Sequence, residues 1–221
     1  MNIELLNCDC MEYMATQPDN AFDLAIVDPP YGIGESGAKN KTRTGGLATP
    51  KNYKAFHGED IEPPGIEYFK ELKRVSKNQI IWGANHFIEN IPNASSPCWV
   101  IWDKQNGGTD FADCEMAYTS FKTAVRMFKF QWSGMLQGEM KNKEVRIHPT
   151  QKPVKLYQWL LDKYAKPGDK ILDTHLGSGS SAIAAHYGGF DFVGMELDEH
   201  YYNLAKERFK RDTAQIDLFQ I

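Results

Sequence analysis

Cysteine is scarce in this chain of 221 residues, which contains only Cys8, Cys10, Cys98 and Cys114. Four cysteines are too few for a disulfide framework, and reduced thiols are typical of a cytoplasmic protein. Cys8 and Cys10 form a C-x-C pair, but the sequence has no C-x-x-C pair or spaced histidine pair that would complete a zinc site. We therefore expect thiols in packing or loop positions, no bound metal and a cytoplasmic location.

Long hydrophobic runs are also missing. No stretch approaches the roughly 18 apolar residues that a membrane-spanning helix needs. The first residues, MNIELLNCDC, lack the basic start and the long apolar stretch of a signal peptide. Hydrophobic residues still make up 42% of the chain, which is enough to bury a full core. We expect a single domain over residues 1–221 and no membrane segment.

Acidic residues are absent from one stretch, although they outnumber basic residues overall and give a net charge of −4. Residues 36–58 contain no acid and five cations, namely Lys39, Lys41, Arg43, Lys51 and Lys54. A second basic stretch, 122–155, holds eight cations and two acids. Such runs are often only solvated surface, but these two flank the candidate site identified below. They predict contacts with nucleic-acid phosphates.

The predicted elements alternate between strands and helices. Apolar strand patterns cover 3–9, 22–28, 79–83, 98–103, 114–121, 125–130, 170–173 and 190–196. Helical patterns cover 10–17, 65–76, 153–165, 180–185 and the residues that follow 196. In the second helix, apolar residues have helical spacing at Ile66, Phe69, Leu72 and Val75. The alternation predicts an α/β fold with a mostly parallel sheet and helices on both faces.

Two segments lack any apolar period. Residues 32–60 are rich in glycine, lysine and threonine, and residues 131–150 are polar. A loop as long as 32–60 in a compact domain is usually functional or disordered. We expect residues 32–60 to form a mobile loop and residues 131–150 to be irregular.

A glycine-rich turn follows the strand pattern at 170–173. Asp173 ends the strand, and Gly177 and Gly179 precede an alanine-rich helix whose free N–H groups favour a ligand. The spacing is neither a Rossmann G-x-G-x-x-G nor a P-loop, and a tight structural turn is the simpler alternative. Glu196 ends the next strand, where an acid can accept hydrogen bonds from both ribose hydroxyls. These parts suit a nucleoside without a pyrophosphate, and S-adenosylmethionine is such a ligand.

The sequence IVDPPYG places a second acid at a strand end. Pro29 and Pro30 cannot donate hydrogen bonds to a neighbouring strand, so the strand must stop at Asp28. A carboxylate, a rigid diproline and the ring of Tyr31 are therefore predicted at the carboxyl edge of the sheet.

Three motifs together resemble a known family. DPPY at 28–31, HPTQKP at 148–153 and LDTHLGSGS at 172–180 resemble the catalytic, linker and cofactor motifs of S-adenosylmethionine-dependent DNA amino-methyltransferases. Their order resembles the β-class, which is circularly permuted, and the likeness covers nearly the whole chain. It implies a single-domain Rossmann-like methyltransferase fold of the kind found in restriction–modification enzymes. Residues 1–147 would form the catalytic half and residues 148–221 the cofactor half.

The resemblance implies a mechanism for the DPPY motif. The Asp28 carboxylate and the Pro29 carbonyl would accept the N–H bonds of an adenine amine, with Pro30 completing the rigid turn. Tyr31 would stack on the extruded base, and the amine would attack the methyl group directly. No thiol nucleophile is required. Pro97-Cys98 lacks the glutamine that follows in enzymes that methylate carbon 5 of cytosine.

The resemblance also implies contacts with S-adenosylmethionine. Asp9, with Cys10 beside it, would bind the adenine amino group, and Asp173 would face the methionine ammonium. Asp28 would border the cofactor, and Glu196 would bind the ribose. The remaining candidates are the backbone of Gly177, Ser178 and Gly179, and the closing segment with His148, Thr150 and Lys152. The family usually has Pro-Phe where this chain has Thr174 and His175. We interpret His175 as a substituted wall residue rather than a catalytic group.

The implied partner is double-stranded DNA, with the N6 amine of adenine as the acceptor. An Asp at the first motif position favours adenine, because N4-cytosine enzymes more often carry Ser there. N4-cytosine methylation remains an alternative, as does a catalytically silent fold that only binds nucleic acid. A homodimer is equally open.

Overall fold

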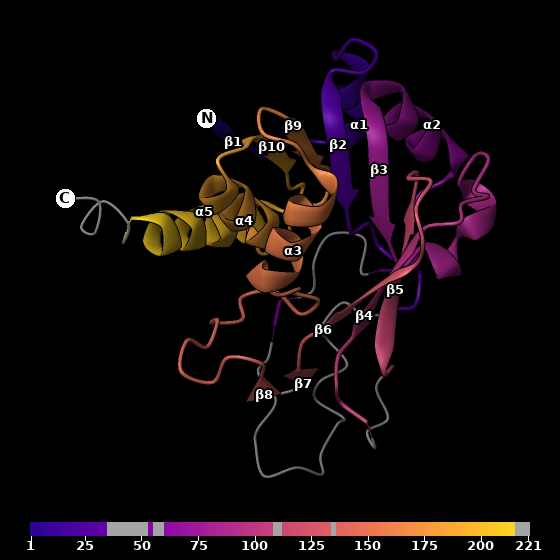
Figure 1. Cartoon of the computed structure of the whole chain (residues 1–221). Coiled ribbons are helices and arrows are strands. Elements are labelled where there is room, and N and C mark those ends of the chain that lie inside the picture. Colours follow the sequence, from indigo (N-terminus) through magenta and orange to yellow (C-terminus); the bar gives the residue numbers. More distant parts are fainter. Residues whose placement is uncertain (35–52, 55–59, 108–111, 134–135, 215–221) are drawn as a thin grey trace.

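An eight-stranded sheet runs through the described part of the molecule (Figure 1). The computed structural model describes residues 1–34, 53–54, 60–107, 112–133 and 136–214. In spatial order the strands are β1 (Ile3–Leu6), β10 (Asp191–Met195), β9 (Lys170–Asp173), β2 (Phe22–Val27), β3 (Ser76–Trp82), β5 (Cys114–Thr119), β4 (Trp99–Asp103) and β6 (Arg126–Lys129). Neighbouring strands are parallel except at β5, which is antiparallel to both β3 and β4.

Helices cover both faces of this sheet. They are α1 (Cys10–Ala15), α2 (Ile66–Val75), α3 (Val154–Tyr164), α4 (Ser180–Gly188) and α5 (Glu199–Thr213). Alternate residues of β2 point to opposite faces: Leu24 and Ile26 join the core cluster with α3 and α4, whereas Ala25 and Val27 join the cluster with α1 and α2. The predicted mostly parallel α/β fold with helices on both faces is confirmed.

Three details of the sequence prediction are wrong. Strand β1 ends at Leu6, and Asp9 instead caps α1, because its carboxylate accepts hydrogen bonds from the N–H groups of Met11 and Glu12. Ile66 is 44% exposed, and Tyr68 is buried on the core face of α2 in its place. Segment 131–150 is not wholly irregular, since β7 (Trp132–Ser133) and β8 (Leu136–Gln137) form a short antiparallel pair.

Asp60 holds the segment that follows the DPPY motif. Its carboxylate accepts hydrogen bonds from the backbone N–H groups of Tyr31, Gly32 and Ile33. Asp60 is only 5% exposed, so these bonds are shielded from water. The chain leaving Tyr31 is therefore anchored from a residue 29 positions later in the sequence.

Most of the predicted loop 32–60 lies outside the described residues. Of the basic run, only Lys54 is described, and its carbonyl accepts a hydrogen bond from the hydroxyl of Tyr201. Lys39, Lys41, Arg43 and Lys51 fall outside the described part. None of the helices in the described ranges is long and apolar enough to span a membrane.

Candidate active site

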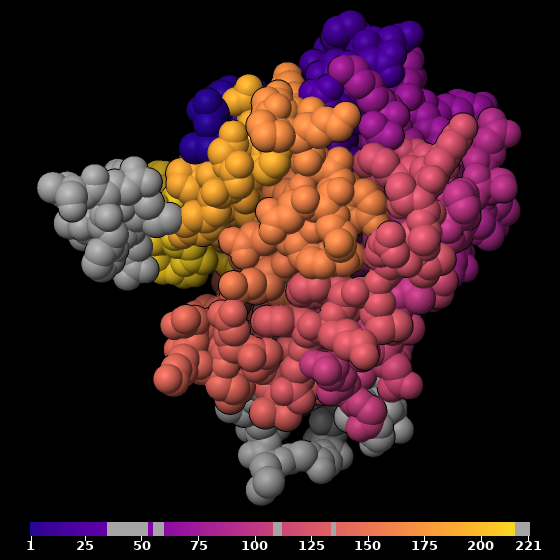
Figure 2. All heavy atoms as spheres, in the orientation of Figure 1, coloured from indigo at the N-terminus to yellow at the C-terminus, as the bar shows by residue number. Residues whose placement is uncertain are grey.

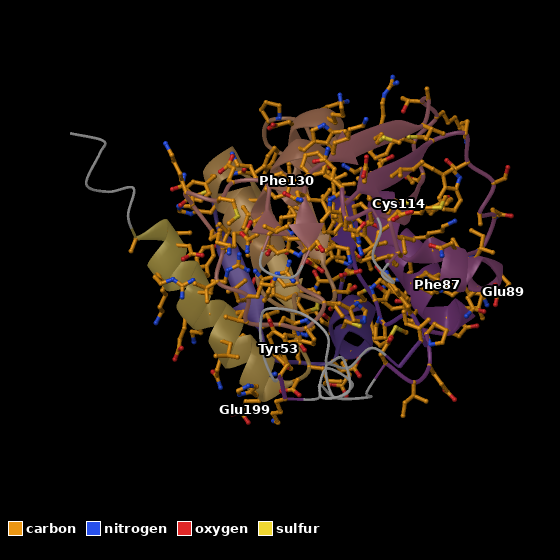
Figure 3. All side chains as sticks on the ribbon, turned by 90° about the horizontal axis from the view of Figure 1, so that it is seen from below. Tyr53, Phe87, Glu89, Cys114, Phe130 and Glu199 are labelled. Atoms are coloured by element: carbon orange, nitrogen blue, oxygen red, sulfur yellow. The ribbon has the colours of Figure 1, made fainter. Side chains whose placement is uncertain are left out.

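The acids that end the parallel strands gather at one edge of the sheet. Asp28 follows β2, Asp173 ends β9 and Glu196 follows β10. The carboxyl ends of parallel strands form the usual ligand-binding edge of an open α/β sheet. Strands β2 and β3 run toward the lower half of Figure 1, and Figure 3 looks at the molecule from that side.

Asp28 is enclosed by two hydrogen-bond donors. The Lys152 ammonium lies 2.5 Å from Asp28 Oδ2, and the Tyr31 hydroxyl donates to Oδ1 at 2.8 Å. Lys152 also lies 3.0 Å from the Tyr31 hydroxyl oxygen. The Asp28 side chain is 14% exposed and that of Lys152 only 4%. The catalytic motif and the HPTQKP motif therefore meet in a nearly dry ion pair.

Tyr31 has a fixed position because Gly83 lies against its ring. A Cβ atom on Gly83 would come within 2.1 Å of the ring, and Gly83 also has a φ of 68°, which side chains rarely adopt. The Tyr31 ring also stacks on His86, with centroids 5.2 Å apart and planes at 16°. Sequence reasoning missed Gly83; a glycine immediately after the apolar strand QIIW is its only signal.

Glu115 and Lys104 extend the ion pair, and sequence reasoning missed both. Glu115 Oε2 lies 3.0 Å from the Lys152 ammonium, and Lys104 lies 2.5 Å from Glu115 Oε1. Because β5 is antiparallel, its first residues reach the edge at which the parallel strands end. The available signal was an acid inside the otherwise apolar strand CEMAYT.

The pKa values of Asp28, Glu115 and Lys152 are set by burial and by the charges of the neighbouring residues. Burial raises the pKa of Asp28, Lys152 opposes that rise and Glu115 adds to it. Burial also raises the pKa of Glu115, but Lys152 and Lys104 outweigh it and lower it to about 2. Burial lowers the pKa of Lys152, yet the two carboxylates raise it above its ordinary value. Lys152 is thus a permanent cation between two acids.

The glycine-rich turn is tied to Glu196. The Gly177 N–H donates to Glu196 Oε2 at 2.8 Å, and the Asp198 N–H donates to Oε1 at 3.0 Å. Gly177 and Gly179 have φ values of 52° and 75°, the left-handed region that glycine tolerates. Each carboxylate oxygen of Glu196 retains a second lone pair for a ligand hydroxyl.

Asp173 is a buried acid, and it forms no ion pair with any residue that the structure describes. Its carboxylate accepts hydrogen bonds from the Ser181 hydroxyl at 2.6 Å and from the His175 N–H at 3.0 Å. Burial raises its pKa to about 7, and the nearby negative charges of Asp28 and Glu196 add to the rise. A cationic ligand group beside Asp173 would stabilise its ionised form and lower its pKa again. Because β2 and β9 pair in parallel, Asp28 and Asp173 lie at the same edge of the sheet.

His175 is neutral at physiological pH, because burial lowers its pKa to about 4, while Asp9 opposes the fall. Its Nδ1 lies 2.9 Å from the Thr174 hydroxyl, which in turn lies 2.6 Å from the Tyr68 hydroxyl. The Tyr68 ring meets that of His175 edge on, at 5.5 Å. The residues that replace Pro-Phe are therefore built into a hydrogen-bonded chain.

The predicted adenine contacts lie at the start of α1. Asp9 is near enough to His175 to influence its pKa, while its carboxylate caps the helix. Burial raises the pKa of the Cys10 thiol to about 12, and Asp9 contributes to that rise. Cys10 is therefore a protonated thiol that packs, and it has no nucleophilic character.

The HPTQKP segment folds over the glycine-rich turn. His148 is buried beside the Tyr201 ring, with centroids 4.4 Å apart, and burial and the Lys152 charge lower its pKa to about 3. Thr150 donates its N–H to His148 Nδ1 at 3.3 Å. The Ser180 hydroxyl donates to the Lys152 carbonyl at 2.7 Å, which joins the segment to α4.

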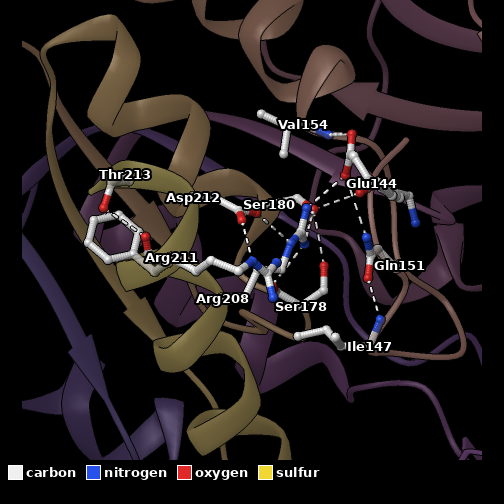
Figure 4. Close-up of polar contacts among 12 residues, drawn as sticks. Glu144, Ile147, Gln151, Val154, Ser178, Ser180, Arg208, Arg211, Asp212 and Thr213 are labelled. Atoms are coloured by element: carbon white, nitrogen blue, oxygen red, sulfur yellow. Dashed lines mark hydrogen bonds and ion pairs between the residues drawn. The ribbon is translucent and has the colours of Figure 1, made fainter. Parts of the chain in front are cut away.

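The buried Arg208 links the glycine-rich turn to the chain that leads into the HPTQKP segment (Figure 4). Arg208 on α5 donates to the Ser178 carbonyl at 3.0 Å and pairs with Glu144 at 2.7 Å. Glu144 also accepts a hydrogen bond from the first N–H of α3, at Val154. Figure 2 shows the salmon-coloured chain that leads into this segment covering the surface below α3. The glycine-rich turn is thus connected to α3 and α5.

A cleft of about 410 Å³ lies directly beyond Glu196. It is lined by Lys54, Leu197, Asp198, Glu199, His200 and Asn203. Glu199, at the start of α5, is labelled in Figure 3. The cleft is formed by residues that follow Glu196 together with Lys54, and its lining does not include the predicted cofactor residues.

The family model for DNA methylases, named N6_N4_Mtase, matches residues 66–207. The chain belongs to this DNA methylase family. The predicted resemblance to S-adenosylmethionine-dependent DNA methyltransferases is confirmed, and the chain is a DNA methyltransferase.

Known DNA methyltransferases align with most of the length of this methylase. The type II methyltransferase M.HinfI of Haemophilus influenzae is 26% identical over 257 residues, which span 93% of this chain and 68% of that protein. The solved complex of M1.HpyAVI with S-adenosylmethionine has a TM-score of 0.54 at 19% identity, covering 93% and 99% of the two chains. The PvuII cytosine-N4-specific DNA methyltransferase has a TM-score of 0.58 at 11% identity, covering 98% and 93%. These two structures show a shared fold; the circular permutation stays a prediction.

Proposed function

We propose that this methylase transfers a methyl group from S-adenosylmethionine to the N6 amine of adenine in double-stranded DNA. One observation carries the proposal: β2, which leads into Asp28, pairs in parallel with β9, which ends at Asp173, so the two acids stand on neighbouring strands at the same edge of the sheet. An acceptor for the target amine is thereby adjacent to the turn that suits the cofactor. The division into a catalytic half (1–147) and a cofactor half (148–221) is part of this proposal.

The residues around the glycine-rich turn fit S-adenosylmethionine. Burial raises the pKa of the Asp173 carboxyl, the charges of Asp28 and Glu196 add to the rise, and the methionine ammonium would supply an opposing positive charge. Glu196 would bind the ribose hydroxyls, and the backbone of Gly177, Ser178 and Gly179 would surround the methionine end. The adenine would be bordered by His175, Asp9 and Cys10. The segment that contains His148 and Thr150 would close over the methionine end of the cofactor. When bound, the cofactor supplies an electrophilic methyl group on a sulfonium.

Asp28 and Pro29 would prepare the target amine. The amine of adenine is a weak nucleophile because its lone pair is delocalised into the ring. Acceptance of its two N–H bonds by the Asp28 carboxylate and the Pro29 carbonyl favours a pyramidal nitrogen with the lone pair available. Pro30 fixes the direction of the turn, and Tyr31 offers a flat ring to the extruded base. The protein thus contributes positioning and electrostatics.

The test is to identify the modified base. We would incubate the protein with methyl-labelled S-adenosylmethionine and unmethylated duplex DNA of mixed sequence, and analyse the nucleosides by mass spectrometry. N6-methyladenine is the expected product. N4-methylcytosine would favour the alternative acceptor. Binding of DNA without transfer would favour a silent fold.

Contact with DNA by the basic run rests on its charge. Neutralised phosphates release counterions, so the logarithm of affinity falls with the logarithm of salt by about 0.9 per contact on duplex DNA. Replacing Lys39, Lys41 and Arg43 by alanine should therefore flatten the salt dependence by up to about three units, if all three reach phosphates. Lys51 and Lys54 are further candidates. An unchanged slope would identify these cations as solvated surface.

A further inference from the structure

Lys152 lies between two carboxylates, and the proposed reaction needs one of them. The ammonium contacts Asp28 at 2.5 Å and Glu115 at 3.0 Å. Asp28 has a donor on each oxygen, since Tyr31 occupies the other at 2.8 Å. A target amine that donates to Asp28 must therefore compete with an ammonium, which is a stronger donor.

The surroundings of Lys152 restrict where its charge can go. The side chain is 4% exposed and lies beside the rings of Tyr31 and Trp82, with the nitrogen 5.4 and 5.6 Å from their centroids. Removing the partner of a buried charge is strongly destabilising. When the ammonium loosens from Asp28, the other carboxylate already in contact with it is that of Glu115.

Glu115 is already positioned to accept the Lys152 ammonium. Lys104 fixes Glu115 Oε1 at 2.5 Å, which leaves Oε2 directed to Lys152. Trp102 on β4 pairs with Glu115, and Lys104 follows the end of β4, so the strand register sets both positions. Figure 3 labels Cys114, the neighbour of Glu115 at the start of β5. The two acids and two lysines balance in charge, so a shift of Lys152 toward Glu115 leaves the group neutral.

We propose that Glu115 is a positioning residue of the transfer reaction, which takes over the Lys152 ammonium when the target amine binds Asp28. This inference rests on the proposed function. Lys152 would exchange between the two carboxylates in each turnover, and Glu115 would act through Lys152 without touching the base or the cofactor.

The test compares E115Q with the parent protein in single turnover, with saturating labelled S-adenosylmethionine and unmethylated duplex DNA. Glutamine keeps the shape and removes the charge, so Lys152 should stay on Asp28. We expect the transfer rate to fall about tenfold or more, while the dissociation constant of the cofactor changes less than about twofold. E139Q is the matched control, because Glu139 pairs with Lys155 at the surface, and its rate should equal that of the parent.

A double-mutant cycle separates positioning from structure. If Glu115 acts through Lys152, E115Q should cost little in a K152M background, less than about twofold. An equal loss in both backgrounds, or a parent-like rate for E115Q, would overturn the proposal. If E115Q fails to fold, E115D retains the charge and should keep more activity than K104M, which releases Glu115; the reverse order would also overturn it. A parent protein without transfer activity would instead refute the proposed function itself, and the inference with it.

Discussion

The glycine-rich turn and the site around Asp28 share one edge of the sheet but are assembled differently. The turn, its acid Asp173 and its partner Glu196 come from one strand–helix–strand unit, with Gly177 and Glu196 only 19 residues apart. The Asp28 site joins Tyr31 to Glu115 over 84 residues and Asp28 to Lys152 over 124. The glycine-rich turn and its acids thus form one local unit, whereas the site around Asp28 depends on the register of the whole sheet.

Removing the Asp28 carboxylate should separate the two sites most clearly, because it should abolish most of the methyl transfer and leave cofactor binding nearly unchanged. Asp28→Ala removes the proposed acceptor of the amine, and loss of one such electrostatic group costs about 10²–10³ in rate. Cofactor affinity should stay within a few-fold, because the turn is built separately. Single-turnover transfer and calorimetry measure the two quantities. A parallel collapse of cofactor affinity would contradict the division into two sites.

Gly83→Ala tests whether the Asp28 site depends on distant packing. The added Cβ would overlap the Tyr31 ring, so the ring must move and take its hydroxyl from Asp28. Misplacement of about 1 Å can cost about 10²-fold in rate, and we expect a loss of that order with unchanged cofactor binding. Gly65→Ala is the control, since a Cβ there meets nothing within 4 Å. Equal activities of the two variants would rule out this role for Gly83.

Glu196→Gln tests the cofactor side of the comparison. The amide keeps the size of the side chain but weakens the bonds to the Gly177 N–H and to the ribose hydroxyls. Hydrogen bonds to charged groups contribute about 1.5–3 kcal/mol, so affinity for S-adenosylmethionine should fall about tenfold. Calorimetry with the cofactor alone provides the measurement. A dissociation constant equal to that of the parent would remove Glu196 from the site.

The pH dependence of cofactor binding should report Asp173. Its pKa of about 7 in the free protein means that it is largely protonated below that pH. The methionine ammonium favours the ionised form, so binding releases a proton and affinity rises as pH increases from 5.5 to 8. The rise is at most about tenfold per pH unit below the free pKa. Asp173→Asn should abolish this dependence. A flat profile for the parent would contradict the assignment.

Sequence reasoning succeeded where structure is local. Prolines stop β2, glycines open α4, and alternating apolar patterns identify the strands, so the α/β fold and both motif regions could be predicted. It failed where position depends on packing between distant segments. Glu115 belongs to the site because β5 runs antiparallel, and nothing in CEMAYT specifies that direction. Lys104 belongs to it because it follows the end of β4, the strand that pairs with β5. Asp9 looked like a strand end, but it is the N-cap of α1, and its carboxylate accepts hydrogen bonds from the N–H groups of Met11 and Glu12.

The buried Arg208 has a practical consequence for handling the protein. It lies near the end of α5, yet it holds Ser178 of the glycine-rich turn and balances Glu144. A deletion that removes Arg208 would leave Glu144 without its counter-ion, and breaking a buried pair costs about 3–5 kcal/mol. Shortened versions for crystallisation should therefore retain the helix through Asp212, which also contacts Arg208. A purification tag should likewise be attached after Thr213, so that the contacts of Arg208 with Ser178, Glu144 and Asp212 are kept.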